Sequence, residues 1–87
     1  MKLPKEIEMG IAARVRERRK ERKLSMTKLS ELSDVSLGSL KRFEKTGEIS
    51  MKSLIKIAIV LDCAEDFEEL FTKKKIMSIQ EIIDGTV

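Results

Sequence analysis

The segment from Ser25 to Gly47, SMTKLSELSDVSLGSLKRFEKTG, holds two short helical patterns with almost no chain between them. The first pattern spans Met26 to Ser33 and the second spans Leu37 to Lys45. The serine before each pattern is a favoured N-cap, and the glycine after the second is a favoured helix stop. A corner of only three or four residues makes two such helices cross at a steep angle.

The corner and the two helices also share an apolar pattern. Asp34 can take the left-handed conformation that a tight corner needs, although less comfortably than glycine. The residues predicted to pack inside this pair of helices are Leu29, Leu32, Val35, Leu40 and Phe43.

Three further helical patterns surround this pair. One runs from Pro4 to about Arg22, because proline suits the first turn and apolar residues recur at helical spacing. A fourth helix follows the cap Ser50 and runs to Leu61, and a short fifth helix spans Ala64 to Phe71. The residues predicted to face inward are Ile7, Met9, Ile11 and Val15 in the first helix, and Leu54, Ile57, Ala58 and Leu61 in the fourth. The sequence therefore predicts an all-α, five-helix domain over residues 5–72, followed by a short C-terminal tail over 73–87 that can form a short helix for dimer or partner contacts.

Length and composition exclude several function classes. With 87 residues, the chain makes one small domain. It has no histidine and one cysteine, Cys63, so it offers neither an intrachain disulfide nor a usual zinc ligand set. No glycine-rich phosphate loop is present, and no base accompanies Cys63. We therefore expect no catalysis, no metal and no cofactor.

The chain also lacks membrane and export signals. Its longest apolar run, Ile57 to Leu61, is far too short to span a bilayer. The N-terminus lacks the apolar segment of a secretory signal. These features predict a soluble, cytoplasmic, nucleoid-associated protein.

Charge is unevenly distributed along the chain. Residues 1–23 carry nine Lys or Arg against four Asp or Glu, while residues 62–87 carry three against seven. The net charge of +3 therefore hides a basic front and an acidic rear. On charge alone, a solvated surface and a polyanion-binding surface are equally good interpretations.

The exposed side of the second crossing helix favours the polyanion. Its positions are small or basic and none is acidic, whereas an ordinary solvated helix mixes both signs; they are Leu37, Gly38, Ser39, Lys41, Arg42 and Lys45. A helix that protrudes from such a corner can enter the DNA major groove. The combined pattern indicates a helix-turn-helix motif at helices 2 and 3, with a double-stranded DNA operator as partner.

Residues from about 11 to 71 resemble the lambda-repressor-like, Xre/Cro-type family of helix-turn-helix proteins. The matching segments are IAARVRERRKERKLSMTKLSELSDVSLGSLKRFEKTGEIS and SLIKIAIVL. The resemblance implies a dimeric, sequence-specific DNA-binding regulator of bacterial or phage origin, usually a repressor. It also implies a structural ion pair between an arginine of the first helix and a glutamate near the end of the recognition helix. Those positions fall on Arg19 and Glu44.

The segment SLKRFEKTGEISMKSLIKIAIVLDCAEDFEELF is in addition similar to HipB-like antitoxins, which are paired with HipA-like kinases. This second resemblance implies an alternative function. The chain would neutralise a HipA-like toxin while it regulates its own operon.

The start of each crossing helix suggests DNA contacts. Ser25 and Thr27 begin a helix whose N-terminal amides and positive dipole end suit a phosphate, although ordinary capping also explains Ser25. Ser36 and Ser39 can bond to base edges or phosphates, and Leu37 can meet a thymine methyl group.

Other residues of the recognition helix suggest different contacts. Gly38 costs ~1 kcal/mol in a helix relative to alanine, which either hints at a close approach of the backbone to DNA or reflects neutral drift. Arg42 has the reach and the fork for guanine O6 and N7, or alternatively clamps a phosphate. Lys41, Lys45 and Lys52 are interpreted as contacts to the DNA backbone.

The C-terminal region carries apolar residues that a five-helix core of this size does not need. Phe67, Leu70 and Phe71 are the candidates for a homodimer seam or for contact with another protein. The sequence leaves both uses open.

Overall fold

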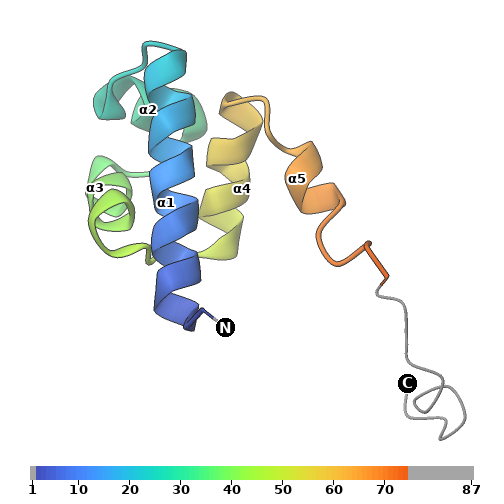
Figure 1. The fold of residues 1–87 in the computed structure, drawn as a ribbon. Helices are drawn as coiled ribbons and strands as arrows, with labels where there is room; N and C mark the ends of the chain where they lie inside the picture. The colour runs from blue at the N-terminus through green and yellow to red at the C-terminus, as the bar shows by residue number, and fades with distance from the viewer. Residues whose placement is uncertain (1, 75–87) are drawn as a thin grey trace, which may run out of the picture.

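The computed structural model describes residues 2–74, which form five α-helices and no strand (Figure 1). The helices are α1 (Pro4–Glu21), α2 (Met26–Ser33), α3 (Leu37–Thr46), α4 (Met51–Val60) and α5 (Glu65–Glu68). The predicted all-α fold with crossing helices α2 and α3 is confirmed. The predicted tail over 73–87 lies outside the described residues except for Lys73 and Lys74.

Serine hydroxyls begin three of the helices, as predicted. The Oγ of Ser25 accepts a hydrogen bond from the backbone N–H of Lys28 at 3.0 Å. Ser36 and Ser50 accept from the backbone N–H three residues further on, each at 3.1 Å. Each cap satisfies one of the amides that a helix start leaves without a partner. The starts of α2, α3 and α4 are therefore determined locally.

The corners that end α2 and α3 use the left-handed backbone conformation. Asp34 ends α2 with φ 61°, and Gly47 ends α3 with φ 79°. A Cβ atom at Gly47 would lie 3.0 Å from the carbonyl carbon and the Cβ of Glu8. Gly47 therefore stops α3 and also lets the chain pack directly on α1.

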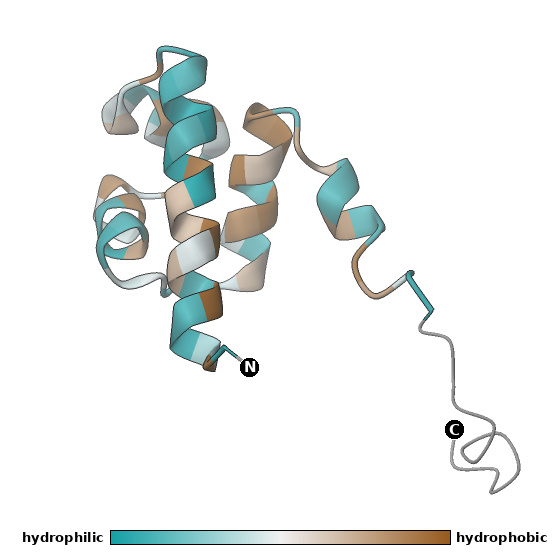
Figure 2. Ribbon diagram, in the orientation of Figure 1, coloured by the Kyte–Doolittle hydropathy of each residue, from teal (hydrophilic) through white to brown (hydrophobic). Residues whose placement is uncertain are grey.

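The core lies between α2, α3 and α4, with α1 packed against α3 (Figures 1 and 2). The largest fully buried side chains lie on these three helices: Leu29 on α2, Leu40 and Phe43 on α3, and Ile57 on α4. Leu29, Leu40 and Ile57 form one cluster with Val35 in the corner and Leu61 after α4. Burying each of these side chains stabilises the fold by about 1.5–3 kcal/mol relative to leaving it in water.

Three predicted core residues are exposed instead. Leu32, Ile7 and Met9 expose 52%, 50% and 37% of their surface. Helix α2 turns Leu29 and Ser33, four residues apart, toward the core, which leaves Leu32 on the outer side. On α1, Glu8 is the residue that meets Gly47, so its neighbours Ile7 and Met9 point away from this contact.

Helix α5 is shorter than predicted, with four residues instead of eight. No side chain caps its start, and it is rich in carboxylates that repel one another. The chain then turns through i to i+3 hydrogen bonds, and Phe71 takes a left-handed φ of 66°. No helix in the described part of the chain is long and apolar enough to cross a membrane.

Candidate nucleic-acid interface

Helix α3 presents two chemically different faces. Leu40 and Phe43 are buried on the inner face, with at most 1% of their surface exposed. The opposite face is exposed and carries the small and basic residues Gly38, Lys41, Arg42 and Lys45. Because positions four apart share one side of a helix, Gly38 and Arg42 lie on the same outward stripe. The core thus fixes α3 from one side and leaves the other side open to a ligand.

An ion pair fastens the inner side of α3 to α1. The Nε of Arg19 donates to Glu44 Oε2 at 2.9 Å, and its Nη2 donates to Glu44 Oε1 at 3.1 Å. Both side chains expose only 9% of their surface. The Nη1 of Arg19 also donates to the carbonyl oxygen of Leu24 at 2.8 Å. One guanidinium therefore joins α1, the α1–α2 connection and α3 in the geometry that arginine and carboxylate favour.

Two serines brace the corner between α2 and α3. The hydroxyl of Ser30 donates to the carbonyl oxygen of Val35 at 2.6 Å. The hydroxyl of Ser33 donates to the carbonyl oxygen of Leu29 at 2.7 Å and accepts from the backbone N–H of Val35 at 3.3 Å. No role was predicted for either serine from the sequence. Both lie in the second half of α2, and serines in short helices are too common to signal a brace.

The first turn of α3 holds a pair of hydroxyls. The Oγ atoms of Ser36 and Ser39 lie 2.8 Å apart, and both residues are exposed. Leu37, which was predicted to be exposed, is half-buried instead. Leu37 precedes Leu40 by three residues and Glu44 by seven, so it shares the side of the helix that turns inward. At the start of α2, Ser25 and Thr27 are exposed.

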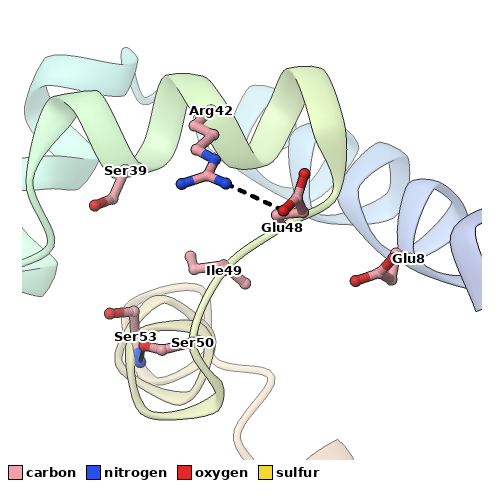
Figure 3. Close-up of a pocket in the computed structure, with 7 residues that line it drawn as sticks. All are labelled: Glu8, Ser39, Arg42, Glu48, Ile49, Ser50 and Ser53. Carbon is pink, nitrogen blue, oxygen red and sulfur yellow. Dashed lines mark hydrogen bonds and ion pairs between the residues drawn. The ribbon is translucent and has the colours of Figure 1, made fainter.

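A hollow of about 460 Å³ lies beside α3, between this helix and the start of α4 (Figure 3). Ser39 and Arg42 reach it from α3, and Ser50 and Ser53 reach it from α4. Glu48, on the connection between the two helices, accepts a hydrogen bond from Arg42 Nη2 at 3.1 Å. Glu8 of α1 also lines the hollow. Neither carboxylate was predicted from the sequence, because Glu8 and Glu48 lie outside the crossing helices.

Three lysines of α3 and α4 differ from Arg42, because they have no carboxylate partner among the described residues. Lys41, Lys45 and Lys52 are exposed, and no carboxylate of residues 2–74 lies within 4.0 Å of their ammonium groups. Each ammonium is a compact point charge on a long flexible stem. These three lysines therefore present available positive charge beside the outward face of α3.

A family model for helix-turn-helix proteins matches residues 15–67, from the middle of α1 to α5. The chain belongs to the helix-turn-helix family. This assignment agrees with the lambda-repressor-like, Xre-type resemblance of the sequence and makes the chain a DNA-binding regulator. No curated protein and no solved structure shows a significant match to it.

In this helix-turn-helix protein, a second hollow of about 410 Å³ lies on the side formed by α1, α4 and α5. Its apolar lining comes from Ile11, Val15, Leu54, Ala58, Leu61, Phe67 and Leu70. We call this surface the α5 groove. Phe67 is half-buried in it, whereas Leu70 exposes 49% and Phe71 95% of its surface. The three predicted interface residues therefore lie together, and Phe71 projects outside the groove.

Arginines flank the α5 groove of the helix-turn-helix protein. Arg14 and Arg18 reach it from α1, and Asp66 reaches it from α5. Hydrogen bonds from Arg18 to Glu21, with the negative charge of that carboxylate, raise the pKa of Arg18 above its ordinary value. Arg18 therefore carries its positive charge beside the groove at neutral pH. Cys63 is half-buried against the core.

Proposed function

We propose that the protein is a dimeric, sequence-specific transcriptional repressor that inserts α3 into the DNA major groove. The observation that carries this proposal is the outward face of α3, which is small and basic and is held rigidly by a core and a buried ion pair behind it. A helix fixed in this way can present side chains to base edges with little further loss of backbone conformational entropy on binding. Recognition by the second helix of the motif is the usual docking geometry of this class.

The proposed contacts fall into two classes. Lys41, Lys45 and Lys52 bind phosphates, which sets the position of the protein on the duplex without reading sequence. At the start of α2, Ser25 and Thr27 offer a phosphate the exposed end of a capped helix.

The second class reads the bases. Arg42 reads a guanine edge, and the exposed part of Leu37 meets a thymine methyl group. Ser36 and Ser39 offer hydroxyls next to them, and Gly38 lets DNA approach the helix backbone.

Dimerisation is the second part of the proposal. A single domain of this size covers only one half-site, and two-fold dimers of this class read half-sites about one helical turn apart. The α5 groove with Phe67, Leu70 and Phe71 supplies the seam, since the groove has an apolar lining and Phe71, next to the groove residue Leu70, is almost fully exposed. An exposed apolar surface of this kind favours a protein partner.

The test separates base contacts from phosphate contacts. Binding selections on randomised duplexes are carried out for the wild type, Arg42→Ala and Leu37→Ala, and salt titrations for Lys41→Ala, Lys45→Ala and Lys52→Ala. Each lysine variant should weaken binding to all sequences alike and reduce the salt slope by about one. Arg42→Ala should cost ~1–3 kcal/mol on the selected site and relax the preference at one base pair, with much less effect on random DNA. Leu37→Ala should cost less and act at a thymine.

The outcomes are distinct. If Arg42→Ala weakens binding to every sequence equally, Arg42 is a phosphate clamp, and Ser36, Leu37, Ser39 or DNA shape must provide the specificity. If the wild type selects no sequence at all, the proposal of a sequence-specific regulator is wrong.

The exposure of Leu70 and Phe71 also favours a second candidate function. A HipB-like antitoxin would use the same surface to hold a HipA-like kinase while the α3 face binds the operator. A gene for such a kinase beside the gene for this chain, and co-purification of the two products, would favour this function. Co-purification that survives Phe71→Ser would show that the kinase binds elsewhere.

A further inference from the structure

Glu48 lies beside the outward face of α3 and pairs with two positively charged side chains. Its Oε1 accepts a hydrogen bond from Arg42 Nη2 at 3.1 Å, and its Oε2 lies 3.7 Å from Lys5 Nζ. The side chain of Arg42 exposes 65% of its surface and that of Glu48 exposes 49%. Figure 3 shows the guanidinium of Arg42 turned toward the α3–α4 connection. In the unbound protein, the arginine with the best reach is therefore already paired.

The connection that carries Glu48 is well anchored. Thr46 Oγ1 accepts from the backbone N–H of Glu48 at 3.2 Å and donates to the carbonyl oxygen of Arg42 at 2.7 Å. Lys5 Nζ donates to the carbonyl oxygen of Thr46. Next to it, Gly47 packs on Glu8. The carboxylate of Glu48 is thus presented to Arg42 by a backbone that the fold itself positions.

We propose that Glu48 is a specificity-determining residue, which competes with DNA phosphates for Arg42 and so lowers the affinity for DNA that offers Arg42 only a phosphate. This inference rests on the proposed function as far as it concerns the choice between DNA sequences. It goes beyond it by assigning a role in discrimination to a residue that lies outside the helix-turn-helix.

The discrimination comes from charge. A phosphate that reaches Arg42 also approaches Glu48, and Glu8 lines the same hollow. Both carboxylates repel the negative phosphate. A guanine edge is neutral and offers O6 and N7 to both arms of the guanidinium, so it gains two hydrogen bonds with far less repulsion. The carboxylates therefore penalise the phosphate more than the base.

The strength of the pair suits this role. An exposed ion pair is worth little, so a good bidentate ligand can displace Glu48. Lys41, Lys45 and Lys52 have no such competitor among the described carboxylates, and they remain available for phosphates. The lysines therefore provide the sequence-independent attraction to DNA, while Glu48 keeps Arg42 from adding to it and leaves it to contact the bases.

The experiment compares Glu48→Gln with the wild type on a random duplex and on the duplex selected by the wild type. Glutamine keeps the size of the side chain and removes its charge. Glu21→Gln is the matched control, because Glu21 also pairs with an exposed arginine but lies on α1. Arg42→Ala and the double variant Arg42→Ala/Glu48→Gln complete a cycle. Fluorescence anisotropy over a salt series measures each affinity, and elution from heparin measures attraction to a polyanion that has no bases.

Glu48→Gln should bind random DNA about three- to fivefold more tightly, the gain that release from one exposed ion pair allows. Its salt slope should be steeper by about one, because Arg42 then counts as a phosphate contact. Affinity for the selected duplex should change by less than about twofold, so the ratio of specific to random binding falls. Glu48→Gln should elute later from heparin, and this gain should vanish when Arg42 is alanine.

Three results would overturn the proposal. An equal gain with and without Arg42 would reveal a general charge effect, and a specific loss on the selected duplex would make Glu48 a base reader. Unchanged heparin elution would show that Glu48 does not withhold Arg42. A wild type with no preferred sequence would disprove the proposed function, and the heparin comparison would still decide the competition for Arg42.

Discussion

Four arginine–glutamate pairs lie among the described residues, and three of them differ mainly in burial; the fourth places Arg16 Nε 3.8 Å from Glu44 Oε1. Arg19–Glu44 is almost fully buried, whereas Arg18–Glu21 and Arg42–Glu48 are about half exposed or more. Exposed pairs gain little, since water screens both charges. A buried pair is costly to break because the remaining charge stays out of water without a partner. The same two residue types therefore hold the fold together in one place and can serve binding in another.

The buried pair gives a stability prediction. Arg19→Ala should lower the free energy of unfolding by about 3–5 kcal/mol, because Glu44 loses its bidentate partner and the carbonyl of Leu24 loses a donor. Urea denaturation followed by circular dichroism measures the change. Glu21→Gln, which breaks the exposed pair of Arg18, is the control and should melt like the wild type. An Arg19→Ala melt that coincides with the wild type would show that the pair contributes nothing.

At the scale of helices, the sequence predicts what depends on local chemistry. Serine caps, the left-handed Asp34 and the glycine stop are each determined by a few neighbouring residues, and all of them are found as predicted. Helix α3 was assigned correctly for the same reason, because its apolar spacing and its cap agree with each other.

The errors concern facts that only tertiary packing determines. Whether Leu32 or Ser33 faces the core depends on how α2 rotates against α4, which periodicity over eight residues does not settle. The end of α5 depends on the lack of packing partners beyond Phe67. In the site, Glu48 approaches Arg42 only because Gly47 folds the connection back, so a search along the recognition helix could not find it.

The two glycines at either end of α3 give an element-scale prediction. Gly38→Ala should stabilise the unbound protein by about 0.5–1 kcal/mol, because nothing lies within 4 Å of the added Cβ and alanine is the better helix former. Gly47→Ala should destabilise it by about 1–3 kcal/mol, because φ is 79° and the added Cβ meets Glu8. Thermal melts of the two variants measure both effects.

Gly38→Ala also tests the proposed close approach of DNA to the backbone of α3. The fold leaves room at Gly38, so any need for glycine there must come from the bound partner. Gly38→Ala should therefore bind the selected duplex more weakly although it is the more stable protein. Unchanged affinity would mean that DNA does not come close to the backbone at this position.

For the whole molecule, the main question is what covers the α5 groove. Phe71 exposes 95% of its surface and follows directly after Leu70, which lines the groove. In a two-fold dimer the same surface serves on both protomers, so each Phe71 can fill part of the groove of the other copy. Such an exchange would bury an aromatic side chain whose exposure is otherwise unfavourable.

Sedimentation velocity gives the assembly prediction. The wild type should sediment as a dimer at micromolar concentration, and Phe71→Ser should shift it to a monomer. When both are measured as monomers, Phe71→Ser and the wild type should have the same thermal stability, because Phe71 makes little contact within the described fold. Leu32→Ser is the control, since Leu32 is another exposed apolar residue (52%) and lies on α2, which contributes nothing to the lining of the groove. A wild type that stays monomeric with and without DNA would contradict the dimer.

The separation of α3 into a fixed inner face and an open outer face bears on how such proteins change during evolution. Leu40, Phe43 and Glu44 connect the helix to its scaffold, while Gly38, Lys41 and Lys45 make no described side-chain contact that the fold requires. Mutations on the outer face can therefore accumulate without crossing the stability threshold that removes most variants. Gene duplication followed by drift on this stripe would give paralogues that share a scaffold and regulate different genes. A designer could follow the same route by transplanting another outer stripe onto this chain.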